Sequence, residues 1–204
     1  LLYALLMNSK FKGKSVARAC IYMPAIISPL IMGYIWYLLL QPGRGVIFNL
    51  LNQMGHPEWF PNWMSSYTSE IVVLVLVNVW QYAGMTMIIY LAGLQNISQD
   101  LYDAAMIDGA TGWQTFWKIT FPLLKPTSVF VLITSVIASF QCLDLIMVMT
   151  GGGPAKSTEV ASLYIYKQSF EMMKAGYGAG LSVVMFLILT VLAVIMLKIN
   201  GKEE

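Results

Sequence analysis

Few residues of this chain belong to the types that carry out covalent chemistry. The single histidine, His56, has no serine, cysteine or carboxylate at a spacing typical of a catalytic or metal-binding site. Cys20 and Cys142 stand alone in apolar surroundings, which indicates packing rather than a disulfide or a metal ligand. The stretch 151–157 is similar to a phosphate-binding loop but lacks the glycine that must precede Lys156. The sequence therefore predicts no catalytic residue, no metal site and no cofactor bound by this chain.

The segment 98–122 carries the most informative pattern of polar and small residues. Ser98 is a candidate N-cap, and the acidic residues after it lie near the positive end of the helix that it would begin. Gly109 can end that helix in a left-handed conformation. Thr111 and Gln114 have the spacing of a capping box, which predicts a second short helix. The segment is too polar for a membrane interior and too apolar to be left in water, so we expect it to bind a partner surface.

The elements that must position this segment are long apolar runs. Of the 204 residues, 58% are hydrophobic and 11% are charged, whereas an average soluble domain has about a quarter charged residues. A helix of about 20 residues spans the hydrocarbon layer of about 30 Å. Pro24 and Pro29 predict a kink in the first complete run. We expect one all-α transmembrane helical bundle over 1–204, with helices at about 1–7 (the end of a longer helix), 19–40, 71–94, 127–149 and 179–197, and a loop at 95–126.

The basic residues near the ends of these runs predict the orientation. The loop 8–18, the loop 95–126 and the C-terminus fall on one side of the membrane, which is predicted to be cytoplasmic because it has the larger number of lysines and arginines. The net charge of +2 is too small to suggest binding to nucleic acid. The predicted inner side holds Lys10, Lys12, Lys14, Arg18, Lys118, Lys125, Lys198 and Lys202, and the outer side holds Arg44, Lys156, Lys167 and Lys174.

The spacing within 98–122 also matches a known family. The segment contains Asp103-Ala104-Ala105 followed in register by Gly109, Ile119 and Pro122. It resembles the EAA loop of permease subunits in binding-protein-dependent ABC importers, whose pattern is Glu-Ala-Ala, three residues, Gly, nine residues, Ile, two residues and Pro. Asp103 replaces the glutamate of that pattern.

Two further stretches resemble one branch of this family. Asp108-Gly109-Ala110 followed by 113–116, and the glycine-rich stretch 150–154, are similar to the permeases for sugars and glycerol-3-phosphate. The resemblance covers essentially the whole chain. It implies a six-helix core that is truncated at its N-terminus, in the inner membrane of a bacterium, with several passes.

The resemblance also implies the partners and the role of the loop. The partners would be a second permease subunit, two cytoplasmic ATPase subunits that bind ATP and Mg²⁺, an external solute-binding protein and membrane lipid. The loop would dock on the ATPase and transmit its motion, so the chain itself would not be an enzyme. Small side chains would allow close approach, the glycine would form the turn, and the acidic residues would accept hydrogen bonds or pair with basic groups. The residues implied are Asp103, Ala104, Ala105, Asp108, Gly109, Ile119 and Pro122.

Four polar residues within apolar runs are candidates for the solute pathway. Asn78, Gln81 and Tyr82 lie in the run 71–94, and sugars are bound by polar and aromatic side chains, but hydrogen bonding between helices explains them equally well. Asp144 is an acidic residue well inside an apolar run, where a charge has a high energetic cost. Because it lies near the predicted outer end of that run, a structural hydrogen bond is favoured over solute contact.

Two other classes of function stay open from the sequence. One is an importer of the same superfamily for another solute, such as amino acids or peptides. The other is a membrane protein that works without an ATPase, either a secondary carrier or a membrane enzyme. A carrier is expected to have paired broken helices in two repeats, and an enzyme is expected to have convergent polar groups within the membrane. The favoured function is the import of a sugar or oligosaccharide.

Overall fold

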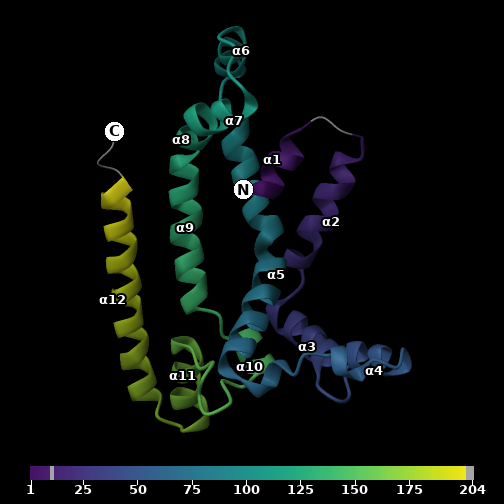
Figure 1. Ribbon diagram of the computed structural model, residues 1–204. Helices are drawn as coiled ribbons and strands as arrows, with labels where there is room; N and C mark the ends of the chain where they lie inside the picture. Colours follow the sequence, from purple (N-terminus) through teal and green to yellow (C-terminus); the bar gives the residue numbers. More distant parts are fainter. Residues whose placement is uncertain (10–11, 201–204) are drawn as a thin grey trace. The chain divides into compact units, whose positions relative to one another are not determined.

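The computed structural model describes residues 1–9 and 12–200, and for 199 and 200 it describes the backbone alone. Lys10 and Lys202, which contribute to the predicted orientation, lie outside the described residues. Helices form the regular structure throughout the described part of the chain, and no strand occurs in it (Figure 1). The predicted all-α class is therefore confirmed.

The chain forms two compact units. Unit 1 contains Leu1–Ala25, Tyr82–Val136 and the residues from Thr190 onward, and unit 2 contains Ile26–Gln81 and Ile137–Leu189. The α-helices are α1 Leu2–Asn8, α2 Lys14–Ile26, α3 Pro29–Leu40, α4 Val46–Gln53, α5 Tyr67–Gln95, α6 Gln99–Ile107, α7 Gly112–Thr115, α8 Phe121–Leu123, α9 Lys125–Phe140, α10 Asp144–Met149, α11 Ala161–Tyr166 and α12 Ala175–Asn200. Short 3₁₀ turns occur at Pro57–Trp59 and Trp63–Ser65, and π-helical turns at Phe116–Thr120 and Lys167–Glu171.

Two long helices of the described chain can each cross a membrane. In α5, Tyr67–Gln95 has 29 residues, and in α12 the stretch Ala175–Lys198 has 24 residues and the higher hydropathy. Only 6% of the most apolar window of α12 is buried within the chain. Its many outward-facing apolar side chains are unfavourable in water and favourable in lipid or against another membrane subunit.

Two predicted spans are interrupted in the structure. The predicted helix 19–40 is instead two helices, because Ile27 and Ser28 leave the helical conformation immediately before Pro29, which has no N–H to donate. The predicted helix 127–149 is interrupted at 141–143, so that α10 is separate from α9. The bent pair α2 and α3, and the pair formed by Gly112–Leu123 and α9, are each apolar enough to count as one broken span.

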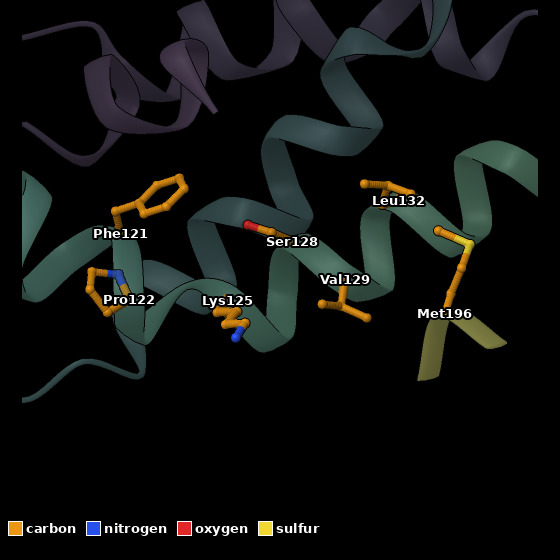
Figure 2. Close-up of a pocket in the computed structure, with 7 residues that line it drawn as sticks. All are labelled: Phe121, Pro122, Lys125, Ser128, Val129, Leu132 and Met196. Atoms are coloured by element: carbon orange, nitrogen blue, oxygen red, sulfur yellow. The ribbon is translucent and has the colours of Figure 1, made fainter. Parts of the chain in front are cut away.

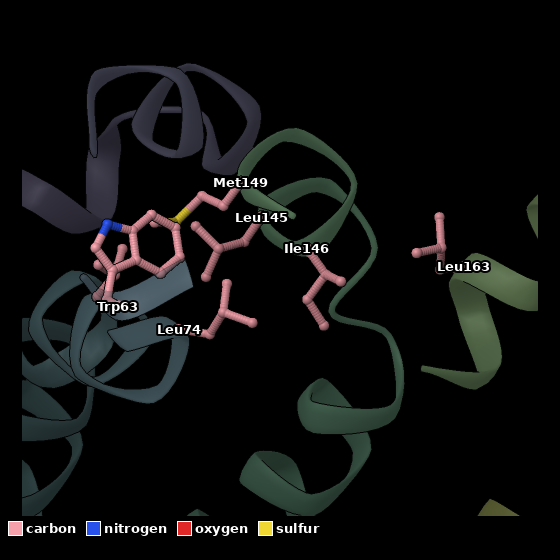
Figure 3. Packing of buried hydrophobic residues seen from close by; sticks show 7 residues of the cluster. Trp63, Leu74, Leu145, Ile146, Met149 and Leu163 are labelled. Carbon is pink, nitrogen blue, oxygen red and sulfur yellow. The ribbon is translucent and has the colours of Figure 1, made fainter. Parts of the chain in front are cut away.

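The hydrophobic core of unit 2 lies around α5, α10 and α11. Trp63 anchors it, because its indole Nε1 donates a 2.6 Å hydrogen bond to the carbonyl of Leu40 at the end of α3. Figure 3 shows Trp63 packed near Leu74 of α5 and the side chains of α10. The buried cluster consists of Trp63, Leu74, Val77, Leu145, Ile146, Met149 and Leu163.

The core of unit 1 lies around α1, α5 and the start of α9, and two glycines allow the helices to approach closely. A Cβ atom at Gly84 would overlap the Ile21 carbonyl oxygen and would lie 2.6 Å from Cα of Tyr22, so α2 contacts the backbone of α5 here. A Cβ at Gly93 would lie 2.6 Å from Oγ1 of Thr127 in α9. The buried residues are Ala4, Met7, Met87, Leu91, Leu94 and Leu124.

Candidate coupling surface

The first helix of the segment 98–122, α6, begins at the predicted N-cap. The Ser98 side chain accepts a 3.2 Å hydrogen bond from the backbone N–H of Asp100. One turn further, the Gln99 side chain donates to Oδ1 of Asp103 at 3.1 Å. Asp100 lies in the first turn, where the helix dipole favours a negative charge. These bonds are local, so the sequence itself dictates where the helix begins.

The turn after α6 depends on Gly109, as predicted. Its φ is +71°, a conformation that side chains with a Cβ disfavour. The N–H of Gly109 donates to the Met106 carbonyl at 3.1 Å, and the N–H of Ala110 donates to the Ala105 carbonyl at 2.9 Å. This pair of bonds is a Schellman motif, which satisfies the last carbonyls of a helix and reverses the chain. Asp108 is the C-cap residue that precedes the glycine.

The second helix, α7, starts with the predicted capping box. The Thr111 side chain accepts from the N–H of Gln114, and the Gln114 side chain accepts from the N–H of Thr111 at 2.8 Å. The helical path continues as a π-helical turn to Thr120 and then as α8. Pro122 lies in the first turn of α8, and α9 begins three residues later.

Tyr102 and Thr120 join the two halves of this loop, and the sequence interpretation did not identify them. The hydroxyl groups of these residues are 3.1 Å apart, and Thr120 is buried. An aromatic cluster extends along the second half, with Trp117 within 5.1–5.7 Å of the rings of Trp113, Phe116 and Phe121. These contacts make the loop a defined piece of structure rather than a flexible linker.

The loop presents exposed apolar side chains at its turn. Met106 and Ile107, the last residues of α6, are 75% and 86% exposed, and Trp113 is 73% exposed. The sequence interpretation missed Met106 and Ile107, although their position directly before the turn was a usable signal. Clusters of exposed large apolar residues commonly mark binding surfaces. We name Met106, Ile107 and Trp113 the apolar tip.

The predicted loop residues divide into an exposed group and a group that packs within the chain. Asp103, Ala104, Asp108 and Gly109 are exposed. Ala105 is buried, so its small size serves contact with its own chain rather than with a partner. The remaining predicted residues are the half-buried Ile119 and the exposed Pro122.

Pro122 also lines a cavity of about 450 Å³ beside α9 (Figure 2). Most of its walls are apolar, and Lys125 and Ser128 are its polar side chains. The other lining residues are Phe121, Val129, Leu132 and Met196. A single lysine and one hydroxyl do not form a catalytic constellation. Within the described residues, no three histidine, cysteine or acidic side chains are grouped so that they could hold a metal ion.

Comparison with known protein families matches residues 1–201 to the family described as binding-protein-dependent transport system inner membrane component. The match covers nearly the whole chain. The chain belongs to this family. The family predicted from the sequence is therefore confirmed, and this family consists of membrane permeases of transport systems rather than of enzymes.

Individual relatives agree with this assignment. The chain is 32% identical over 201 residues to the "Probable starch degradation products transport system permease protein AmyD" of Thermoanaerobacterium thermosulfurigenes, which covers 98% of this chain and 68% of that protein. It is 33% identical over 198 residues to the trehalose/maltose transport system permease protein MalF of Thermococcus litoralis, with coverage of 97% and 66%. The chain thus spans about two thirds of the length of these two relatives.

A solved structure extends the similarity to three dimensions. A chain in the crystal structure of a bacterial ABC transporter, described as involved in the import of the acidic polysaccharide alginate, matches the permease with a TM-score of 0.82. The two chains are 25% identical, and the match covers 98% of this chain and 71% of the other. The fold is therefore that of an ABC transporter permease.

The structure places the four candidate pathway residues of the permease in different surroundings. Asn78 donates to the sulfur of Cys142 at 3.7 Å, whereas Gln81 is almost fully buried and donates to the Ile27 carbonyl. Asp144 lies in the first turn of α10, where the helix dipole favours its charge. Tyr82 is partly exposed and belongs to unit 1, while the other three belong to unit 2. Hydrogen bonding within the chain accounts for Asn78 and Gln81.

Proposed function

We propose that this permease is a subunit of an ATP-driven importer, and that the apolar tip on α6 and α7 is the surface to which a cytoplasmic ATPase subunit binds. The observation that carries the proposal is the combination of a capped, rigid turn with exposed apolar side chains. The caps at Ser98 and Thr111 and the left-handed Gly109 fix the backbone, while Ile107 is 86% exposed. Because the ends of α6 and α7 are capped, the turn between them can move as a rigid body and transmit a displacement.

Transport would then proceed without covalent chemistry in this chain. ATP and Mg²⁺ would be bound by the ATPase subunits, and closure of the ATPase pair would displace the loop as a rigid body. The contact between Tyr102 and Thr120 and the aromatic cluster around Trp117 would pass that displacement to α8 and α9. Asp103 and Asp108 are exposed, and they would accept hydrogen bonds from basic groups of the ATPase.

The proposed cargo is an oligosaccharide. The relatives named for starch degradation products and for trehalose and maltose, and the transporter involved in alginate import, all handle carbohydrates. A second permease subunit would supply the other half of the pathway. An external solute-binding protein would deliver the solute, consistent with the description of the family and with the solved alginate transporter that contains a periplasmic protein bound to an alginate pentasaccharide.

The proposed topology places the apolar tip in the cytoplasm of a bacterial cell and the chain in its inner membrane, with several passes. The larger number of basic residues on the side of the loop 95–126 supports this orientation. Lys118 and Lys125 contribute to that side, and Lys167 and Lys174 lie on the other. Insertion of single cysteines into the two sides, followed by labelling with a membrane-impermeant maleimide in intact cells, tests the orientation.

Uptake into proteoliposomes tests the proposed function. The full-length permease is reconstituted with its neighbouring permease and ATPase, with the binding protein outside and ATP inside. We expect ATP-dependent uptake of a labelled maltodextrin or another oligosaccharide, and its loss when Ile107 is replaced by Asp. Uptake of amino acids or peptides but not of sugars would assign the importer to another solute. Uptake that continues without ATP or the ATPase would indicate an independent carrier and would contradict the proposal.

A further inference from the structure

The break between α2 and α3 leaves backbone groups without their helical partners. Pro29 has no N–H to donate to the Ala25 carbonyl four residues earlier, and the Ile27 carbonyl lies in the non-helical segment between the two helices. Ser28 is not helical, with φ −52° and ψ 134°, and its side chain makes no capping bond. In a membrane an unpaired carbonyl group has a high energetic cost, because no water is available to hydrogen-bond it. The break therefore requires a donor from another element.

Gln81 of α5 supplies such a donor. Its Nε2 donates a 3.1 Å hydrogen bond to the carbonyl oxygen of Ile27, the first residue after α2. The side chain of Gln81 is 1% exposed, so the bond is shielded from solvent. Leu74 and Val77, which precede it on the buried face of α5, are apolar. Gln81 and Glu70 are thus the buried polar residues of this face of α5, and Ser157 hydrogen-bonds the Glu70 carboxylate.

Packing alone does not explain a glutamine at this position. Its Oε1 is buried and has no hydrogen-bond partner among the described residues. A methionine would have a similar length without leaving a buried oxygen unpaired, and an unpaired buried acceptor destabilises a fold. Glutamine is therefore favourable here only if its N–H group is needed. The Ile27 carbonyl is the acceptor that uses this group.

A second contact holds the chain on the other side of the break. Gly84 lies one turn after Gln81 on α5, and its lack of a side chain allows the backbone of α2 at Ile21 and Tyr22 to approach. The α2 helix is thus fixed directly against α5 before the break, and Gln81 binds the first residue after it.

We propose that Gln81 is a positioning residue of the transport machinery, which preserves the break between α2 and α3 by hydrogen-bonding the Ile27 carbonyl. This inference rests on the proposed transport function and extends one of the two sequence interpretations of Gln81, hydrogen bonding between helices, rather than the other, which places it in the solute pathway. Rigid-body transport requires a broken helix to move with its neighbours. If the Ile27 carbonyl lost its partner, the angle between α2 and α3 would change more easily during the movement that the ATPase drives. Less of that movement would reach the transport pathway, so ATP hydrolysis would be less tightly coupled to transport.

The test uses the complete transporter in proteoliposomes and measures the amount of solute transported per ATP hydrolysed. With Gln81→Met, we expect this ratio to fall at least about fivefold, because a buried hydrogen bond is lost. The solute concentration at half-maximal uptake stays unchanged, because Gln81 does not touch the solute. Gln81→His keeps an N–H donor of similar reach and is expected to retain most of the coupling. Gln141→Met, which removes an exposed amide, is the control.

Normal coupling in Gln81→Met would overturn the inference, as would a rise in the half-maximal concentration at an unchanged maximal rate, which indicates solute contact. A transporter whose wild type shows no ATP-dependent uptake would instead contradict the proposed function.

A double-mutant cycle covers the case in which Gln81→Met does not assemble. Pro29→Ala restores an N–H for the Ala25 carbonyl and allows the helix to continue, so that the Ile27 carbonyl can accept from the N–H of Ile31 in its own segment. The amount of assembled complex is measured for Gln81→Met in both backgrounds. We expect the loss in the Pro29→Ala background to be less than half of that in the wild-type background. If Gln81→Met lowers the amount of assembled complex equally in both backgrounds, the effects of the two substitutions are additive, and the inference is overturned.

Discussion

At the scale of single residues, the turn of the proposed coupling loop depends on one backbone conformation. Gly109 has φ +71°, and a Cβ there is strained even though no atom lies close to it. Gly109→Ala is expected to destabilise the turn by about 1 kcal/mol and to weaken ATPase binding about fivefold. Gly112→Ala is the matched control, since Gly112 begins α7 without a positive φ and also has open space around it. Equal affinities of the two variants, measured by ATPase titration, would contradict this role.

A second residue, Lys167, ties the glycine-rich stretch 150–154 to the helix that follows it. Its Nζ donates at 2.9 Å both to the Gly151 carbonyl and to the Glu159 carboxylate, which is largely buried. Lys167→Met leaves both acceptors without this donor, and the expected loss of unfolding free energy is about 1–3 kcal/mol. Thermal unfolding in detergent measures the effect. Lys174→Met changes an exposed lysine nearby and is expected to unfold like the wild type. An unchanged unfolding temperature for Lys167→Met would show that the bonds of Lys167 to Gly151 and Glu159 do not stabilise the permease.

At the scale of helices, the packing of α2 on α5 depends on Gly84. A Cβ there meets backbone atoms of Ile21 and Tyr22, which cannot rotate away as a side chain does. Gly84→Ala is therefore expected to shift α2 and to destabilise the permease by about 1–3 kcal/mol. Gly180→Ala in α12 is the control, because no atom lies within 4 Å of its added Cβ. If both variants unfold at the wild-type temperature in detergent, α2 and α5 do not pack as closely at Gly84 as described.

The caps of α6 and α7 could be predicted from sequence because each depends on residues within one turn. Ser98, Gly109 and Thr111 all act on neighbouring backbone groups, and their predicted roles are confirmed. The break before Pro29 could not be predicted in the same way. Proline in a membrane helix allows either a kink or a break, and the structure stabilises the break through Gln81, 54 positions away in the chain.

The burial of individual loop residues was also beyond the sequence pattern. Ala104 and Ala105 are adjacent and identical, yet one is exposed and the other buried. Their environments depend on how α6 packs against the rest of unit 1, which the spacing of Gly109 and Pro122 does not encode. The spacing of the loop residues was enough to predict the family, whereas only the structure shows which of their side chains are exposed to a partner.

At the scale of the whole molecule, the permease is incomplete without other subunits or lipid. Nearly all of the apolar window of α12 faces outward, and the apolar tip exposes three large side chains on a rigid turn. The two surfaces differ in chemistry. The α12 surface is continuous and suits lipid or another membrane helix, while the tip is flanked by Asp103 and Asp108 and suits a water-soluble partner with basic groups.

Co-purification shows directly whether the apolar tip binds the ATPase. The full-length permease is expressed with its neighbouring permease and ATPase, and the amount of ATPase retained in detergent is measured. Ile107→Asp places a charge at the tip, and Met173→Asp places one at a residue of similar exposure in unit 2. We predict at least about a tenfold loss of ATPase for Ile107→Asp, as expected for a buried interface side chain, and wild-type retention for Met173→Asp. Equal retention of the ATPase by both variants would show that the apolar tip is not its binding surface.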